Sequence, residues 1–170
     1  MYAHTFVYIE KLFKTRGNLT VMLSRTHFVI GLLFVMIFLP STSHPWIFSF
    51  AMIISSLIPD IDSPMSLFGK NKVFSPLQSL VNHRGLIHSL TLAFILSLLL
   101  SLIFPSAALG FFLGYSIHLL ADSFTIEGVS PFWPLRGRIS WKLKTGGYFE
   151  NAFFVVISLF DILLIIRHFS

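Results

Sequence analysis

Apolar residues form five long runs along the chain, separated by polar connections. The runs are Phe28–Leu39, Trp46–Ile58, Leu86–Phe104, Ala107–Ala121 and Phe149–Ile166. The third and fifth are long enough to cross about 30 Å of hydrocarbon at about 1.5 Å per residue. The first two are short, which predicts helices that thin the bilayer, cross it with little tilt or form a re-entrant hairpin. The pattern therefore predicts an all-α, polytopic membrane helical bundle of about five helices.

The composition supports a membrane environment. Of the 170 residues, 55% are hydrophobic, 11% are charged and 20 are Phe. Soluble domains carry about a quarter charged residues, so lipid is the better solvent for this surface. The length fits one domain. The chain has no cysteine, which excludes disulfides, zinc–thiolate sites and thiol nucleophiles.

Basic residues fall almost entirely on one side of the predicted helices. Of 12 Lys and Arg residues, 11 precede the first run or lie in the connections 59–85 and 122–148, and only Arg167 lies opposite. The positive-inside rule places that side, with the N-terminus, in the cytoplasm. Because the basic residues alternate with apolar runs, the net charge of +5 does not indicate a nucleic-acid partner. The sequence leaves the oligomeric state open.

The first 21 residues stand apart from the membrane pattern. Their apolar positions are scattered and they lack the core of a cleavable signal. We interpret residues 1–21 as an N-terminal extension, with Met22 as an alternative start. Residues 22–170 are then predicted to form a single membrane-embedded domain.

Side chains able to bind metal gather at the predicted cytoplasmic helix ends. They are His27, Asp60, Asp62, His83, His88, His118 and Asp122. His118 and Asp122 are four residues apart and share one helix face. Asp60 and Asp62 follow a proline in a turn, where two close carboxylates repel each other unless a cation lies between them. His83 is predicted in the loop before Gly85, with His88 on the helix proper.

This set of donors predicts a divalent metal site and hydrolytic chemistry. Imidazole with carboxylate suits zinc, manganese or iron, and carboxylate alone favours magnesium. Seven candidates exceed the need of one tetrahedral ion, so we expect one or two ions. Such a site activates water against a phosphoester. Asp62 is then a ligand or the general base, and Arg84 a bidentate phosphate donor. At head-group depth the expected substrate is a lipid or a lipid-linked phosphate.

Two other functions fit the same residues. A metal or proton transporter would need polar residues continuing through the bilayer, where Asp161 is the main candidate. A non-catalytic membrane protein would use the metal only to hold short helices together. Single His residues at helix ends are also common as caps, and Glu127 and Glu150 read as solvated loop or helix-start residues.

Several short motifs occur in an order that resembles a known family. They are Thr26-His27 with Gly31, Leu57–Pro64, His83-Arg84-Gly85 with His88-Ser89, Gly114-Tyr115 with His118-Leu119, and Asp122, Thr125, Gly128 and Trp133-Pro134. Together they resemble the YdjM-type bacterial inner-membrane proteins, described as membrane-bound metal-dependent hydrolases. The resemblance runs from about Thr26 to Pro134.

The resemblance implies a multi-pass protein of the prokaryotic inner membrane that binds metal and hydrolyses a substrate. It also implies a link to the DNA-damage response for some members. A more distant similarity to zinc-dependent phospholipase C and P1-type nucleases implies zinc held by His and Asp, and phosphoester substrates. The chain departs from the family at Ile87, where Thr is usual. A hydroxyl group that could orient the neighbouring ligand His88 or a water is therefore missing, and we expect the surroundings of that ligand to differ.

Overall fold

The computed structural model describes residues 22–63, 66, 69–80, 85–135 and 137–170. This part of the chain is helical and contains no β-strand; its only β-type pairings are two isolated bridges, Thr125 with Leu143 and Val129 with Ile139. The predicted all-α class is therefore confirmed. The proposed extension, residues 1–21, lies outside the described residues.

Five principal helices form the bundle: α2 (Ser24–Phe38), α3 (Pro45–Ser55), α5 (Leu90–Ser101), α6 (Pro105–Ser123) and α7 (Tyr148–Phe169). Shorter helical segments lie between them: Leu39–Ser41, Pro59–Asp62, Lys72–Phe74 and α4 (Ser75–Leu80). Among the described residues, three apolar segments are long enough to cross a membrane, namely Ser24–Ser41, Pro45–Asp62 and Tyr148–His168. The first reaches this length because the helix starts at Ser24 and the 3-10 helix Leu39–Ser41 follows it; the second does so because the 3-10 helix Pro59–Asp62 follows α3 after a short turn.

Two helices differ in extent from the predicted runs. The third run yields only the 12 residues of α5, about 18 Å. Ser89 ends the preceding turn and caps the helix, its side chain accepting a hydrogen bond from the Leu92 amide at 3.2 Å. The fourth run is longer than expected, because Pro105 starts α6 and the helix continues for 19 residues to Ser123.

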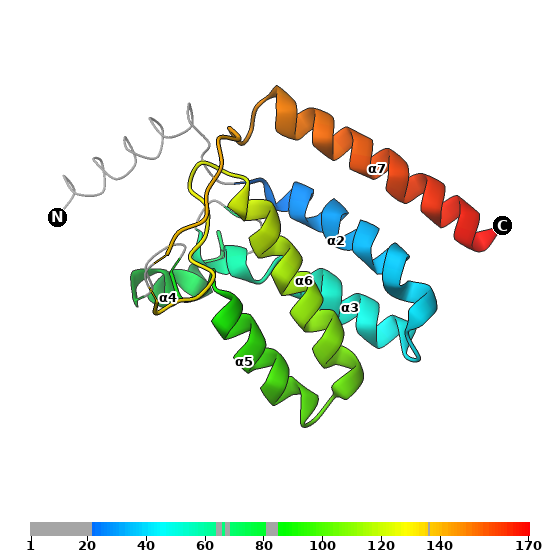
Figure 1. Ribbon diagram of the computed structural model, residues 1–170, viewed down its shortest axis with the longest axis horizontal. Helices are drawn as coiled ribbons and strands as arrows, with labels where there is room; N and C mark the ends of the chain where they lie inside the picture. Colours follow the sequence, from blue (N-terminus) through cyan, green and yellow to red (C-terminus); the bar gives the residue numbers. More distant parts are fainter. Residues whose placement is uncertain (1–21, 64–65, 67–68, 81–84, 136) are drawn as a thin grey trace.

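The chain folds as two helical hairpins with α7 along one side (Figure 1). Short connections join α2 to α3 and α5 to α6 at one end of the bundle. The described parts of the long connections 56–89 and 124–147 lie at the opposite end, where α2 and α7 begin. Helix α7 packs mainly against α2. The segments with candidate ligands thus share one end of the molecule.

Close contact between α3 and α6 fixes the centre of the bundle. A Cβ atom added at Gly114 would lie 2.1 Å from the Met52 carbonyl oxygen, and one at Gly110 would lie 2.5 Å from that of Phe48. Small residues four apart allow membrane helices to approach in this way. The same contact brings the end of α3 beside the last turns of α6.

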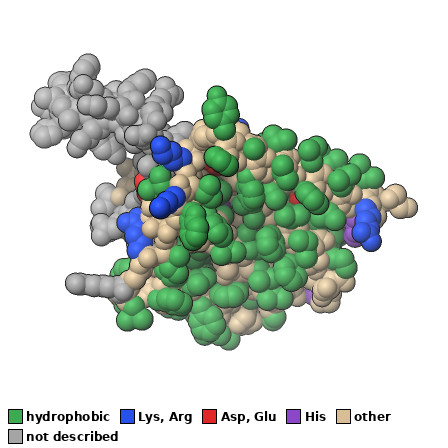
Figure 2. Space-filling model, turned by 45° about the horizontal axis from the view of Figure 1, so that its top comes forward, with side chains coloured by type: hydrophobic (Ala, Val, Ile, Leu, Met, Phe, Trp, Pro, Cys, Tyr) green, Lys and Arg blue, Asp and Glu red, His purple; other side chains and the backbone are tan. Residues whose placement is uncertain are grey.

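The surface is typical of a protein surrounded by lipid. Large apolar side chains are widely exposed, including Trp46, Leu102 and Phe149. Figure 2 shows hydrophobic side chains covering the middle of one face, with Lys and Arg gathered toward its two ends. An apolar band between charged ends matches a bilayer better than water.

Candidate metal centre

Six of the predicted ligands meet in one buried cluster, which we call the His/Asp cluster. Its members are His27, Asp60, Asp62, His88, His118 and Asp122. Each is at most 3% exposed. His83 and Arg84 lie outside the described residues, so their predicted roles as ligand and phosphate donor stay predictions.

Four separate segments deliver these side chains. His27 lies in the first turn of α2, and His118 and Asp122 lie in the last turns of α6. The 3-10 helix Pro59–Asp62 carries Asp60 and Asp62. His88 sits in the turn before α5, not on the helix as predicted, because α5 begins only at Leu90. The cluster therefore forms only when the whole bundle is folded.

Asp122 lies at the centre of the cluster. Its Oδ1 is 3.4 Å from His27 Nε2. Its Oδ2 is 3.4 Å from His88 Nε2 and 3.6 Å from His118 Nε2. The two carboxylate oxygens thus face different histidines, so each oxygen could act as a separate donor atom if metal were bound.

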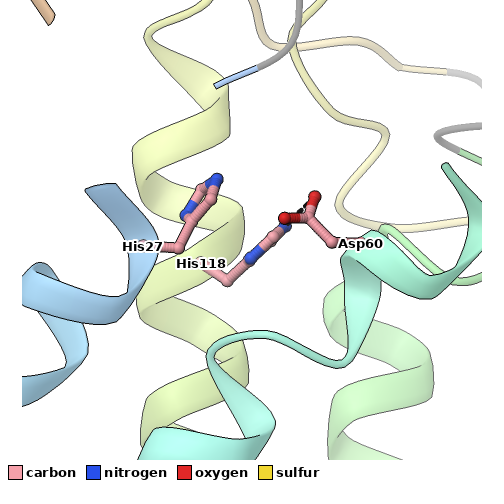
Figure 3. Close-up of side chains that lie close together, drawn as sticks. All are labelled: His27, Asp60 and His118. Carbon is pink, nitrogen blue, oxygen red and sulfur yellow. Dashed lines mark ion pairs between the residues drawn. The ribbon is translucent and has the colours of Figure 1, made fainter. Parts of the chain in front are cut away.

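The environment of His118 leaves one ring nitrogen for a ligand. Its Nδ1 is 2.8 Å from the Ser56 carbonyl oxygen, so Nδ1 carries the proton and donates. The Nε2 atom is then an acceptor and points into the cluster, 3.9 Å from Asp60 Oδ1. The His118 ring also stacks on His27, with centroids 3.9 Å apart. Figure 3 shows His118 between His27 and Asp60.

His88 is held between two carboxylates. Its Nδ1 is 3.3 Å from Asp62 Oδ2, on the opposite side of the ring from Asp122. Burial disfavours the protonated form, but contacts with Asp122 and Asp62 outweigh burial and raise the pKa of His88 to about 9. A carboxylate on the far nitrogen of a histidine commonly orients a metal ligand, and Asp62 is placed for that role.

The spacing of the donor atoms fits a shared cation. The contacts among His27, Asp60, His88, His118 and Asp122, at 3.4–3.9 Å, exceed the ordinary hydrogen-bond range of about 2.7–3.2 Å. Two donors at zinc-ligand distances on a tetrahedral ion lie about 3.3 Å apart. Among the described residues, His27, Asp60 and His118 form one group whose donor atoms lie within 4.8 Å of each other, and His88, His118 and Asp122 form another.

Neighbouring hydroxyl groups hold the aspartates in place. Ser24 Oγ donates to Asp60 Oδ2 at 2.9 Å, and Ser66 Oγ donates to the Asp60 carbonyl oxygen at 2.6 Å. Thr125 Oγ1 donates to the Asp122 carbonyl oxygen at 2.7 Å. These bonds restrict the ligand-bearing backbone and so support a fixed donor geometry.

Glu150 has a structural role that its position in the sequence did not reveal. It lies in the first turn of α7, as the helix-start interpretation predicts, but it is not solvated, because it is only 5% exposed. Its Oε1 accepts hydrogen bonds from the Leu23 amide at 2.7 Å and from Thr26 Oγ1 at 2.8 Å. Glu150 thus joins the start of α7 to the turn that carries His27. The partners are more than 120 positions apart, so no local signal could have indicated them.

Two other acids lie outside the cluster. Glu127 is in the 124–147 connection, where its carbonyl oxygen accepts from Arg138 Nε. Asp161 lies within the α7 span and is 3% exposed. Neither of its carboxylate oxygens has a hydrogen-bond partner among the described residues.

The fold and the cluster define a class: helical membrane proteins with a buried His and Asp site at one end of the bundle. Within that class, the chain belongs to the YdjM inner membrane protein family, whose model matches residues 22–168. This confirms the family resemblance and the inner-membrane assignment at the level of the family.

Individual relatives agree with this assignment. The chain is 34% identical to inner membrane protein YdjM of Escherichia coli K12 over 120 residues, which cover 64% of this chain and 60% of that protein. It is 31% identical to YvsG of Bacillus subtilis over 107 residues, covering 58% of this chain and 65% of YvsG. The chain thus spans less than two thirds of the length of these relatives. No solved structure matches it.

Proposed function

We propose that this protein is a metal-dependent hydrolase that cleaves a phosphoester of a membrane lipid or lipid-linked substrate. The observation that carries this proposal is the convergence of six buried His and Asp side chains from four segments. Burying three carboxylates together is costly unless cations compensate them. Buried clusters of ionisable side chains are enriched at functional sites.

The donor set suggests which residues would hold the metal. His118 offers only Nε2, so it serves a single ion, with His88 and Asp122 as its neighbours. The Oδ1 atom of Asp122 faces His27, which together with Asp60 could serve a second ion. Nitrogen and oxygen ligands in this mixture favour zinc or manganese over magnesium.

The chemistry would divide between the ion and the chain. A bound divalent ion supplies Lewis acidity toward water and a phosphoryl oxygen. Asp62 lies outside both donor groups, where it would orient His88 and accept the proton of the attacking water. Arg84 is the proposed phosphate donor on sequence grounds alone.

The position of the cluster in the bundle suggests the substrate class. It lies at the end where the long, basic connections meet, which we propose faces the cytoplasm. A site at the end of membrane-crossing helices lies near the lipid phosphates. A lipid phosphoester could therefore reach it without leaving the bilayer.

Metal content and hydrolysis together test the proposal. Detergent-purified protein should contain one or two zinc or manganese ions per chain by elemental analysis, and the Asp122→Asn variant should lose them. Loaded protein should release product from at least one phosphoester in a panel of phospholipids and lipid-linked phosphates. Wild-type protein that holds no transition metal, and whose stability is unchanged by chelation, would overturn it.

A non-catalytic metal staple is the alternative that the structure itself motivates. The cluster joins α2, α6, the end of α3 and the turn before α5, so a metal would stabilise the bundle even without chemistry. The two functions differ in catalysis and not in metal binding. If the wild type holds metal and chelation lowers its unfolding temperature, but it cleaves no phosphoester in the panel, the staple is the better description.

A further inference from the structure

A cavity of about 590 Å³ lies beside the His/Asp cluster, between α2, α6 and α7. Its volume is in the range of ligand-binding pockets. Helix α7 contributes Phe149, Phe153 and Val156 to its wall, and Ile117 comes from α6. Four polar residues also line it, namely Thr125, Lys144, Thr145 and Glu150. They come from the connection between α6 and α7 and from the start of α7, and we call this end of the cavity its polar mouth. The wall of the cavity itself is almost entirely apolar.

The polar mouth adjoins the cluster. Ala121 and Thr125 line the cavity on either side of Asp122, and Thr125 bonds to the Asp122 backbone. Glu150 lines it too and accepts a hydrogen bond from Thr26, the neighbour of His27. None of the six cluster residues lines the cavity itself. A ligand with an apolar tail in the cavity would therefore place its head group beside the helix ends that carry His27 and Asp122.

The surroundings indicate what kind of molecule fits. Two of the walls, α2 and α7, belong to candidate membrane spans, so the cavity lies at hydrocarbon depth, where acyl chains are the abundant apolar groups. Lys144, an exposed residue of the 124–147 connection, is one of the residues at the mouth, and its positive charge complements an anionic phosphate. Glu150, the other charged residue there, already accepts hydrogen bonds from the Leu23 amide and Thr26 Oγ1. The cavity and its mouth thus match an anionic lipid.

We propose that the cavity binds one hydrocarbon chain of a phosphate-bearing lipid, whose head group is presented to the His/Asp cluster. The inference rests on the proposed function and narrows its substrate class to long-chain lipids. A water-soluble phosphoester would make no use of the cavity, so chain length should control turnover.

Photo-crosslinking tests occupancy without requiring activity. The full chain is reconstituted in vesicles containing a phosphatidic acid with a diazirine in one acyl chain. Adducts should concentrate on cavity residues such as Ile117 and Val156. Unlabelled long-chain phosphatidic acid should compete, whereas glycerol phosphate should not. Val156→Trp should lower labelling several-fold, while Val155→Trp, on a neighbouring exposed residue outside the cavity lining, should not.

Several outcomes would overturn the inference. Crosslinks spread evenly over the exposed helix faces, with equal labelling of the Val156→Trp and Val155→Trp variants, would show that the probe reports only the lipid that surrounds the protein. If a free fatty acid competed with the labelled lipid as well as long-chain phosphatidic acid does, the cavity would not require a phosphate group on its ligand. Labelling that appears only after deletion of residues 1–21 would assign the cavity to the N-terminus of the chain.

Kinetics separate this inference from the proposed function. In metal-loaded protein, Val156→Trp should slow hydrolysis of long-chain phosphatidic acid several-fold more than hydrolysis of p-nitrophenyl phosphate. Equal slowing of both substrates would contradict the chain site while leaving the hydrolase intact. Absence of any hydrolysis by the wild type would instead contradict the proposed function, and the crosslinking result would still report on the cavity.

Discussion

The roles of individual ring nitrogens distinguish the residues of the cluster from one another. His118 gives its Nδ1 proton to the Ser56 carbonyl and keeps Nε2 for the cluster, whereas His88 has a carboxylate near each nitrogen. Asp62 therefore acts through His88, and Asp122 acts directly. Removing either should reduce metal binding, but by different amounts.

We predict that Asp62→Asn weakens metal affinity about 10–100-fold, as loss of an outer-shell partner does. Asp122→Asn should abolish stoichiometric binding because Asp122 contacts all three histidines. Competition titration with a chelating dye measures both. Glu127→Gln, outside the cluster, is the matched control. Equal effects of the Asp62 and Asp122 variants would contradict the distinction.

Metal binding should also depend on pH. In the metal-free protein the pKa of His88, which lies in the connection before α5, is raised to about 9, so at pH 7 an ion must displace a proton from it. We expect the apparent affinity to rise up to about tenfold per pH unit from pH 7 toward pH 9, and then to level off. Titrations at fixed ionic strength measure this, and a flat profile would contradict it.

Sequence reasoning identified which residues gather, but not how their atoms are arranged. The polar residues at helix ends were informative because polarity is rare in this chain. The choice of nitrogen on His118 depends on the backbone of Ser56, 62 positions away. The burial of Glu150 depends on Leu23 and Thr26. Such long-range partners leave no pattern in a single sequence.

At the scale of helices, the contact between α3 and α6 sets the position of half the cluster. We predict that Gly114→Ala destabilises the protein by about 1–3 kcal/mol, since its new Cβ would collide with the Met52 carbonyl and separate the helices. Thermal unfolding in detergent measures this. Gly137→Ala is the control, because a Cβ there meets nothing within 4 Å. Equal stability of the two variants would contradict the packing argument.

The attachment of α7 to α2 depends on one buried carboxylate. Glu150→Gln should cost about 1.5–3 kcal/mol, because the carboxylate accepts several hydrogen bonds, including those from Leu23 and Thr26. We expect faster proteolysis in the 124–147 connection and a lower unfolding temperature. Unchanged proteolysis would show that apolar packing alone holds α7 in place.

The helices were predicted from apolar runs, and their number and class were correct. The predicted ends of the helices were wrong, because a polar residue marks the end of a helix only when its polar group faces water. Helix α2 begins at Ser24, ahead of the predicted apolar run from Phe28, since Thr26 and His27 are buried although they are polar. Leu86–Ser89 looked like the start of a helix, but instead forms the turn that presents His88.

At the scale of the whole molecule, the long connections share one end and the short ones share the other (Figure 1). We predict that Lys142→Cys reacts with a membrane-impermeant maleimide only from the cytoplasmic side, and Ser43→Cys only from the opposite side. Both positions are exposed, and the chain has no cysteine of its own. Labelling of both from the same side would rule out the proposed topology.

The His/Asp cluster draws on segments that begin at position 27 and end at position 122. An ion bound there would therefore bind the assembled bundle and not the unfolded chain, so its binding energy would add to folding stability. Cells short of the metal would then hold fewer intact copies, because loosely assembled copies would be degraded by membrane proteases. The amount of this protein in the membrane would rise and fall with the metal supply, even if its gene were transcribed at a constant rate.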